Sequence, residues 1–299
     1  MRLIHPHWRA SEPDSLPDHI TEIPRVNLQP PLDSREMAIG AGKPIWSTPA
    51  EPAELQAFRL RGGTRGCLLL HGFAGTPPEV RGLGEHLASH GYDVMAPLLA
   101  GHGLTPEAMG ATRWPDWARS AAEALRSLQA TCDEVFVAGQ SLGGSLALHL
   151  AATQPQVRGV VTMGAMGSPR FFTDWRLRII GGLKYVVRWH VPGEDCDLGD
   201  PTALRFLHSY ARRPTVCIES LLQLLSLIES ELPSISVPAL VLHGRRDRTV
   251  DVGNASFILD RLGSSDKELR WFEGSGHTIT VDLERDQVNA TVLSWLEAH

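Results

Sequence analysis

Residues 134–152 read EVFVAGQSLGGSLALHLAA, and this stretch decides the class of fold. An apolar run typical of a buried strand leads into Gly139-Gln140-Ser141-Leu142-Gly143, and an apolar helix is predicted over residues 141–152. Glycines flank the serine because a Cβ there would collide with a neighbouring strand or helix. The alternative is a serine that only caps a helix, which would account for the hydroxyl but not for the strand, the flanking glycines and the helix together. We therefore interpret Ser141 as a candidate nucleophile on a sharp strand-to-helix turn.

Predicted strands and helices alternate outward from this turn. Apolar runs bounded by turn residues indicate strands over residues 54–60, 65–70, 93–96, 134–138, 157–163, 239–242 and 267–272. Apolar stripes at helical spacing indicate helices over residues 78–90, 114–129, 141–152, 254–262 and 284–296. This alternation predicts an α/β fold, with a mostly parallel sheet and helices on both of its faces.

Two stretches interrupt the alternation. Residues 1–52 hold nine of the 21 prolines, which remove backbone donors and fix φ, so we expect an extended N-terminal arm there. About 75 residues between Met163 and Ala239 contain no convincing strand. A structureless loop of that length is uncommon in a compact domain. We therefore predict a small, largely helical cap insertion over about residues 165–232, within a main domain spanning residues 53–299.

Composition excludes several classes of protein. The formal charge of −6 and the pI near 6.1 argue against nucleic-acid binding, which needs a basic footprint. No segment reaches the roughly 20 apolar residues that span a bilayer, so we expect no stable membrane insertion. No signal-peptide pattern is visible, which makes the cytoplasm the expected location.

The four cysteines lack C-x-x-C spacing, and a metal role for His5, His7 and His19 is a minor alternative to solvated side chains. The oligomeric state stays open.

A serine hydroxyl needs a base, and His277 is our candidate. It follows the last predicted strand through residues 273–276, a loop that can direct it back over the sheet edge. Three alternatives are placed less well: His149 lies inside a predicted helix, His71 ends a strand, and His102 lies between two glycines. Only His277 completes the chain order serine, acid, histidine.

Asp247 is the candidate acid that orients this histidine. It stands in LVLHGRRDRTV, just past an apolar strand and between the serine and the histidine in sequence. A carboxylate there can accept the imidazole Nδ1–H and stabilise the imidazolium. Asp251 is the second candidate, and a loop-capping role is the structural alternative for Asp247.

Two backbone N–H groups are expected to face the negative charge that develops on the substrate. One belongs to the residue after the nucleophile, which is Leu142. The other comes from the loop after an early strand, for which LLLHGFAGTP is suited, with Phe73 as the donor.

Four segments together resemble the bacterial carboxylesterase and monoacylglycerol lipase family of the α/β-hydrolase superfamily. They are LLLHGFAGTPPEVRGLGEHLASHGYDVMAPLLAGHG, VAGQSLGGSLAL, ALVLHGRRDRTV and WFEGSGHTITVDLERDQV, which cover residues 68–103, 137–148, 239–250 and 271–288. The resemblance runs from about residue 60 to the end, and the pattern around His277 is more specific than the serine motif.

The resemblance implies an α/β-hydrolase fold with Ser141, Asp247 and His277 as the triad and with Phe73 and Leu142 as the oxyanion hole. It also implies a small lid over an acyl pocket, for which we expect the residues Met166, Phe171 and Trp175. Aromatic and basic residues of the cap are interpreted as cap core and solvated charge, with a basic rim for an anionic substrate as the alternative.

The implied activity is hydrolysis of short- to medium-chain carboxylic esters or monoacylglycerols, small-molecule substrates, without cofactor or metal. A serine at position 141 argues against dehalogenases and epoxide hydrolases, which use an aspartate nucleophile. Thioesterase, amidase, acyltransferase and carbon–carbon hydrolase activities stay open because the same triad serves all four. A non-catalytic binding module of this fold is a further alternative.

Overall fold

The computed structural model describes residues 38–39, 55–171, 187–191 and 196–299. The chain divides after Arg35 into two units, and all described residues belong to the second, Glu36–His299. The expected arm over residues 1–52 therefore lies outside the described residues, apart from Ala38–Ile39, and so do His5, His7 and His19. Its extended character stays a prediction.

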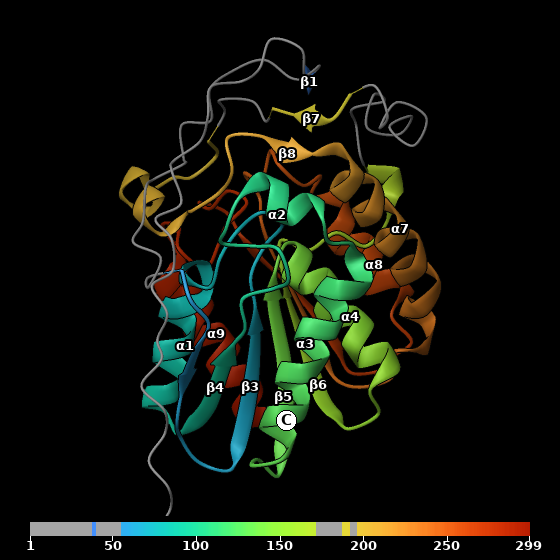
Figure 1. Cartoon of the computed structure of the whole chain (residues 1–299). Coiled ribbons are helices and arrows are strands. Elements are labelled where there is room, and N and C mark those ends of the chain that lie inside the picture. Colours follow the sequence, from blue (N-terminus) through green and yellow to red (C-terminus); the bar gives the residue numbers. More distant parts are fainter. Residues whose placement is uncertain (1–37, 40–54, 172–186, 192–195) are drawn as a thin grey trace, which may run out of the picture. The chain divides into compact units, whose positions relative to one another are not determined.

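A seven-stranded sheet forms the centre of the second unit (Figure 1). Its spatial order is β10-β9-β6-β5-β3-β4-β2, and every neighbouring pair is parallel except β2 with β4. The strands are β2 (Phe58–Leu60), β3 (Arg65–Leu70), β4 (Tyr92–Ala96), β5 (Glu134–Gln140), β6 (Val157–Met163), β9 (Ala239–Gly244) and β10 (Lys267–Phe272). The prediction of a mostly parallel sheet is confirmed.

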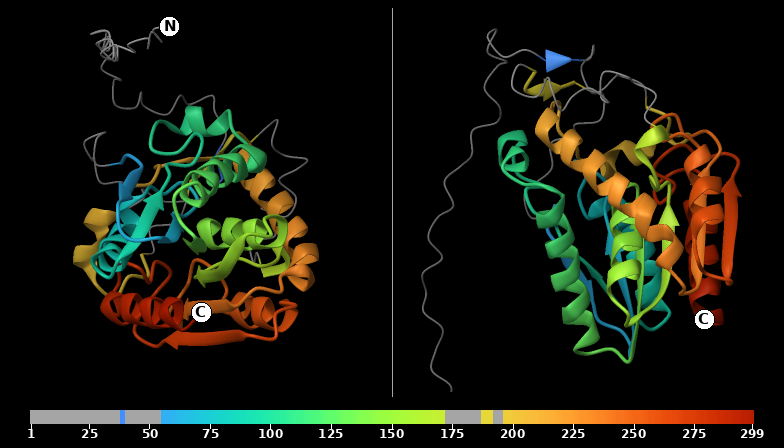
Figure 2. Two further views of the ribbon diagram at one scale, coloured as in Figure 1. Left: turned by 90° about the horizontal axis from the view of Figure 1, so that it is seen from below. Right: turned by 90° about the vertical axis from the view of Figure 1, so that its right-hand side faces the viewer.

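Helices cover both faces of the sheet (Figure 2). One face packs against α1 (Pro78–Ser89) and α9 (Arg285–Ala298). The other packs against α3 (Trp114–Gln129), α4 (Leu142–Thr153) and α8 (Gly253–Arg261), and α7 (Thr215–Glu231) packs on α3 and α4. Along β3, Leu68 and Leu70 face the second group while Cys67 and Leu69 face the first, since side chains alternate along a strand. Burial on both faces explains the unbroken apolar run.

Several element ends differ from the sequence-based bounds. Strand β5 runs on to Gln140 and α4 begins at Leu142, so Ser141 stands between the two elements. Strand β9 extends to Gly244, which adds His243 to its carboxyl end. Helix α2 (Pro106–Gly110), capped by the Thr105 side chain, was not predicted because five residues are too few to show a helical period.

The stretch expected as a cap is described only in part. It holds the 3₁₀ helices η1 (Pro169–Phe171) and η2 (Pro201–Phe206), the helix α7 and two strands that the sequence did not indicate. These strands, β7 (Trp189–His190) and β8 (Arg213–Pro214), pair with each other, and β7 also pairs with β1 (Ala38–Ile39). Because two-residue strands carry no readable alternation, the pattern missed them. The cap bounds over 165–232 stay a prediction.

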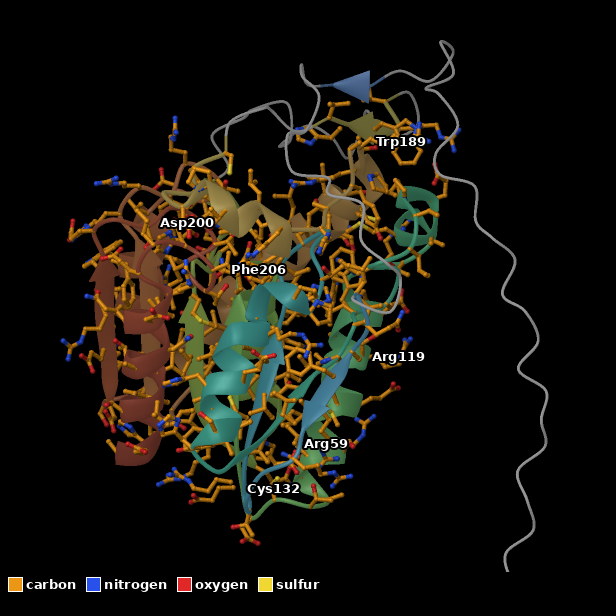
Figure 3. The ribbon with its side chains drawn as sticks, turned by 90° about the vertical axis from the view of Figure 1, so that its left-hand side faces the viewer. Arg59, Arg119, Cys132, Trp189, Asp200 and Phe206 are labelled. Carbon is orange, nitrogen blue, oxygen red and sulfur yellow. The ribbon has the colours of Figure 1, made fainter. Side chains whose placement is uncertain are left out.

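Helix α7 shares its apolar face with the main domain. Leu221, Leu224 and Leu225 are buried in the same cluster as side chains of α3 and α4. In Figure 3, Asp200 and Phe206 lie at the end of the domain opposite to Arg59 and Cys132. Residues 200–206 therefore lie toward the carboxyl ends of the parallel strands, where open α/β sheets bind ligands.

Candidate active site

Ser141 occupies a strained turn between β5 and α4. Its φ of 55° and ψ of −118° fall in a region that L-residues rarely adopt, and such strain costs about 1–3 kcal/mol. A Cβ on Gly139 would lie within 3.0 Å of Gly143 backbone atoms, and one on Gly143 would lie within 3.0 Å of the Leu70 carbonyl on β3. Glycine is therefore required at both positions for α4 to approach the sheet this closely.

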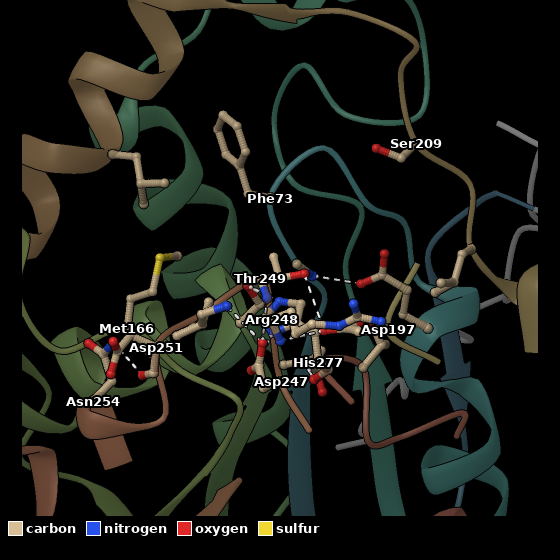
Figure 4. Close-up of a pocket in the computed structure, with 18 of the residues that line it drawn as sticks. Phe73, Met166, Asp197, Ser209, Asp247, Arg248, Thr249, Asp251, Asn254 and His277 are labelled. Carbon is tan, nitrogen blue, oxygen red and sulfur yellow. Dashed lines mark hydrogen bonds and ion pairs between the residues drawn. The ribbon is translucent and has the colours of Figure 1, made fainter. Parts of the chain in front are cut away.

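A continuous hydrogen-bond chain links Ser141, His277 and Asp247. Figure 4 shows His277 and Asp247 close together in the pocket. His277 Nε2 lies 3.0 Å from Ser141 Oγ, and His277 Nδ1 lies 2.8 Å from Asp247 Oδ2. The carboxylate can only accept, so Nδ1–H donates to Asp247 and leaves Nε2 to accept from the serine hydroxyl. The structure thus brings together three side chains that follow β5, β9 and β10.

Asp247 is buried and well supplied with donors. Its Oδ1 accepts hydrogen bonds from Thr249 N at 2.9 Å and Val250 N at 2.7 Å, while Oδ2 faces the imidazoles of His277 and His243. Burial raises the pKa of Asp247, but the two histidines outweigh it and hold the pKa well below its usual range. Asp251, the second candidate, is exposed and accepts from Gly253 N instead.

The carboxylate acts on the histidine in turn. Burial lowers the pKa of His277, but the charge of Asp247 and its hydrogen bond outweigh burial, so the pKa is raised. This is the direction that a general base needs, because a more basic imidazole takes the serine proton more readily.

The three alternative histidines have other partners. His71 is fully buried, donates from Nδ1 to Gly72 O at 3.0 Å and accepts at Nε2 from Leu99 N at 3.1 Å. Burial lowers the pKa of His71 to about 3 and that of His102 to about 4, so both are neutral. His149 pairs with Glu231 at 2.9 Å.

The two candidate oxyanion donors lie in the loop after β3 and at the start of α4. Phe73 follows β3, and Leu142 is the first residue of α4. Within the described part of the chain, neither backbone N–H donates a hydrogen bond to a protein acceptor. Ala74, next to Phe73, has a φ of 60°, which shows that this loop is held in a tight conformation.

A cavity of about 600 Å³ opens above Ser141 and His277, within the size range of small-molecule sites. Met166 and Phe171 line it as expected, and the Phe171 ring packs against Phe257 with centroids 5.6 Å apart. Trp175 lies outside the described residues. Further apolar lining comes from Phe73, already named as an oxyanion donor, and from residues that the sequence did not single out: Leu198, Leu207, Ile218, Leu221 and Val250.

Two further titratable residues adjoin the site and were missed by sequence reasoning. His243 contacts Asp247, and Glu79 lines the cavity beside Gly72. A histidine at the end of an otherwise apolar strand is a usable signal for His243. Glu79 gave no such signal, because an acidic residue in a first helical turn is ordinary.

No cluster of metal-ligating side chains occurs among the described residues. In the same part of the chain, no helix is long and apolar enough to cross a membrane.

A serine on a strained strand-to-helix turn, hydrogen-bonded to a histidine that follows the last strand of a mostly parallel sheet, defines an α/β-hydrolase. The sequence profile of the family described as serine aminopeptidase, S33, matches residues 64–284, and the chain belongs to that family.

Two relatives indicate which kind of α/β-hydrolase this chain is. The chain is 31% identical over 242 residues to a carboxylesterase of Bacillus subtilis (strain 168), a match that covers 80% of this chain and 95% of the relative. It is also 31% identical over 245 residues to a thermostable monoacylglycerol lipase of Bacillus sp. (strain H-257), covering 82% and 95%. The resemblance seen in the sequence is confirmed, and the chain is a serine ester hydrolase.

Solved structures agree with this placement. A chain from the work on LipS and LipT, two metagenome-derived lipolytic enzymes, superposes with a TM-score of 0.77 at 30% identity, covering 82% of this chain and 98% of that one. A soluble variant of monoglyceride lipase from Saccharomyces cerevisiae gives a TM-score of 0.70 at 19% identity, covering 81% and 91%, which supports the fold alone.

Proposed function

We propose that this protein hydrolyses short- to medium-chain carboxylic esters or monoacylglycerols, with Ser141 as nucleophile, His277 as general base and Asp247 as orienting acid. The observation that carries the proposal is the hydrogen-bond chain with its distances of 3.0 Å and 2.8 Å. Nucleophile, base and orienting group are all within hydrogen-bond reach, as acyl transfer requires.

The reaction proceeds in two steps. As the Ser141 hydroxyl attacks the ester carbonyl, His277 Nε2 takes its proton, and Asp247 stabilises the resulting imidazolium. The Phe73 and Leu142 amides donate to the oxyanion of the tetrahedral intermediate. The alcohol leaves with the proton from His277, and water, activated by the same histidine, then hydrolyses the acyl-enzyme.

The substrate class is supported by the cavity and by the relatives. A volume of about 600 Å³ with Met166, Phe171 and Leu221 among its lining residues suits an acyl chain of modest length. The relatives named as carboxylesterase and monoacylglycerol lipase cover the same part of the chain. We propose that the cap, over about residues 165–232, forms the wall of this cavity that faces the sheet.

The test is hydrolysis of p-nitrophenyl esters from acetate to palmitate and of monoacylglycerols, with Ser141→Ala as the control. We expect activity on the shorter esters and a loss on the order of 10⁴-fold or more in the variant. Matched p-nitroanilides and thioesters run beside the esters. Preference for either would replace ester hydrolysis by amidase or thioesterase activity, and wild-type inactivity on all of them would overturn the proposal.

A further inference from the structure

We propose that Glu79 is a positioning residue that sets the orientation of the Phe73 N–H in the loop after β3. The inference deepens the proposed function and rests on it, because it assigns a role in stabilising the oxyanion. Glu79 belongs to the first turn of α1, has an exposed fraction of only 7% and lines the cavity together with Gly72, Phe73 and Ser141.

The loop is folded around the Glu79 carboxylate. Glu79 Oε2 accepts a hydrogen bond from Gly72 N at 2.9 Å. A Cβ on Gly75 would overlap Oε1, and a Cβ on Gly72 would lie 3.1 Å from Oε2 and 3.5 Å from Ser141 Cβ. The two glycines therefore leave room for the carboxylate, and Gly72 also leaves room for Ser141.

The peptide between Gly72 and Phe73 is also held by hydrogen bonds to its carbonyl oxygen. Gly72 O accepts from Gly75 N at 3.1 Å and from His71 Nδ1 at 3.0 Å. In a trans peptide the N–H points opposite to the C=O, so the Phe73 N–H is directed away from His71 and Gly75. With Gly72 N held by Glu79, the backbone on both sides of Gly72 has its direction set by hydrogen bonds.

The charge of Glu79 is offset by the Arg213 cation and, once it has taken the serine proton, by the His277 imidazolium. Burial raises its pKa to about 7, against the opposing effects of the Gly72 amide, His277, the Thr76 amide and Arg213. Arg213, on β8, lines the same cavity, and its guanidinium lies 6.0 Å from the centre of the Phe73 ring. An ionised carboxylate alone would repel a nearby oxyanion. Glu79 therefore contributes as a hydrogen-bond acceptor for the loop, while Arg213 and the His277 imidazolium that forms in the transition state offset its charge.

A purely structural role for Glu79 predicts a different outcome. An acid in the first turn of a helix interacts favourably with the helix dipole, and its removal then lowers stability without changing turnover. Positioning of Phe73 predicts a fall in kcat at nearly constant KM, because the oxyanion interaction is made only in the transition state.

The experiment compares Glu79→Ala with Glu79→Gln, using p-nitrophenyl butyrate, fluorophosphonate labelling of Ser141 and thermal unfolding. Glu79→Ala removes the acceptor, and we expect kcat and the labelling rate to fall about 10- to 100-fold with KM little changed. Glu79→Gln keeps an amide oxygen that can accept from Gly72 N, so it regains most of this loss. Without the negative charge, the His277 pKa falls, and the acid limb of kcat/KM moves to lower pH.

Asp93→Asn is the matched control. Asp93 is a buried carboxylate on β4 that pairs with Arg59 at 2.8 Å, at the amino end of the sheet. We expect this variant to unfold at a lower temperature while keeping kcat.

Wild-type kcat in a folded Glu79→Ala protein, or an equal loss of kcat in Glu79→Ala and Glu79→Gln without a shift of the acid limb, would overturn the inference alone. Absence of wild-type ester hydrolysis would overturn the proposed function, and the inference with it.

Discussion

His243 Nε2 lies 3.0 Å from Asp247 Oδ2, the same carboxylate oxygen that accepts the hydrogen bond from His277. The contact is close in distance without the alignment of a full hydrogen bond. Both side chains are shielded from solvent, so the Asp247 carboxylate stands between two imidazoles.

We expect His243→Leu to lower kcat/KM about tenfold, because Asp247 loses a neighbour that stabilises its charged form and helps to fix its orientation. Steady-state kinetics on p-nitrophenyl butyrate measures the effect. His149→Leu is the matched control, since it breaks a histidine–carboxylate pair with Glu231 away from the cavity. Equal kinetics in His243→Leu and the wild type would show that His277 and the amides of Thr249 and Val250 are enough to hold Asp247.

The raised pKa of His277 predicts the pH dependence of the reaction. The base must be neutral, so kcat/KM rises with pH through a midpoint above the ordinary histidine value near 6.5. In Asp247→Asn the midpoint falls, because the charge that raised the pKa is gone, and kcat drops about 10⁴-fold. A profile from about pH 5 to pH 9 measures both. A midpoint that does not move in the variant would show that Asp247 does not raise the pKa of His277.

The same pair links folding stability to pH. The folded-state pKa of Asp247 is lowered, so its contribution to the free energy of unfolding is complete above its unfolded value, near 3.9, and is lost as pH falls through the folded value. For His277 the raised pKa reverses the sign, and its contribution is lost as pH rises through the folded value. Urea unfolding at several pH values measures this contribution. The difference in free energy of unfolding between Asp247→Asn and the wild type should be smallest at the most acidic pH.

Gly143→Ala tests the close approach of α4 to the sheet. Its Cβ would meet the Leu70 carbonyl, which cannot move without shifting β3, so we expect about 1–3 kcal/mol of destabilisation and a loss of activity as the turn moves. Gly82→Ala is the opposite case, since nothing lies within 4 Å of its Cβ in helix α1. It should stabilise the protein by about 0.5–1 kcal/mol. Denaturant unfolding that ranks the two variants in the reverse order would contradict this packing.

The size of residue 166 should set the preferred acyl length. Met166 lines the cavity, so Met166→Ala lengthens the preferred chain and Met166→Trp shortens it. The p-nitrophenyl ester series measures both shifts. Met95→Ala, on β4 and not part of the cavity lining, should change stability but not chain-length preference. An unchanged optimum in both Met166 variants would place the acyl chain elsewhere in the cavity.

Strand and helix positions were readable because they depend on local pattern. The unbroken apolar run of β3 and the strand–glycine–helix order around Ser141 are visible within a few residues of sequence. Short elements were not readable in this way. Helix α2 and strands β7 and β8 are too brief to show a period. The two strands form because each supplies the other with a hydrogen-bonding partner from a separate segment of the chain.

The sequence by itself determined the α/β alternation, the turn that carries Ser141, and candidates for base and acid placed after later strands. Parallel strands bring their carboxyl ends to one edge, so chain order alone predicts that residues in those positions meet. Only the tertiary structure decided that Glu79 lies under the loop of Phe73, that His243 faces Asp247, and that α7 contributes Ile218 and Leu221 to the cavity. Such contacts depend on the distance and rotation between packed elements, which no local period encodes.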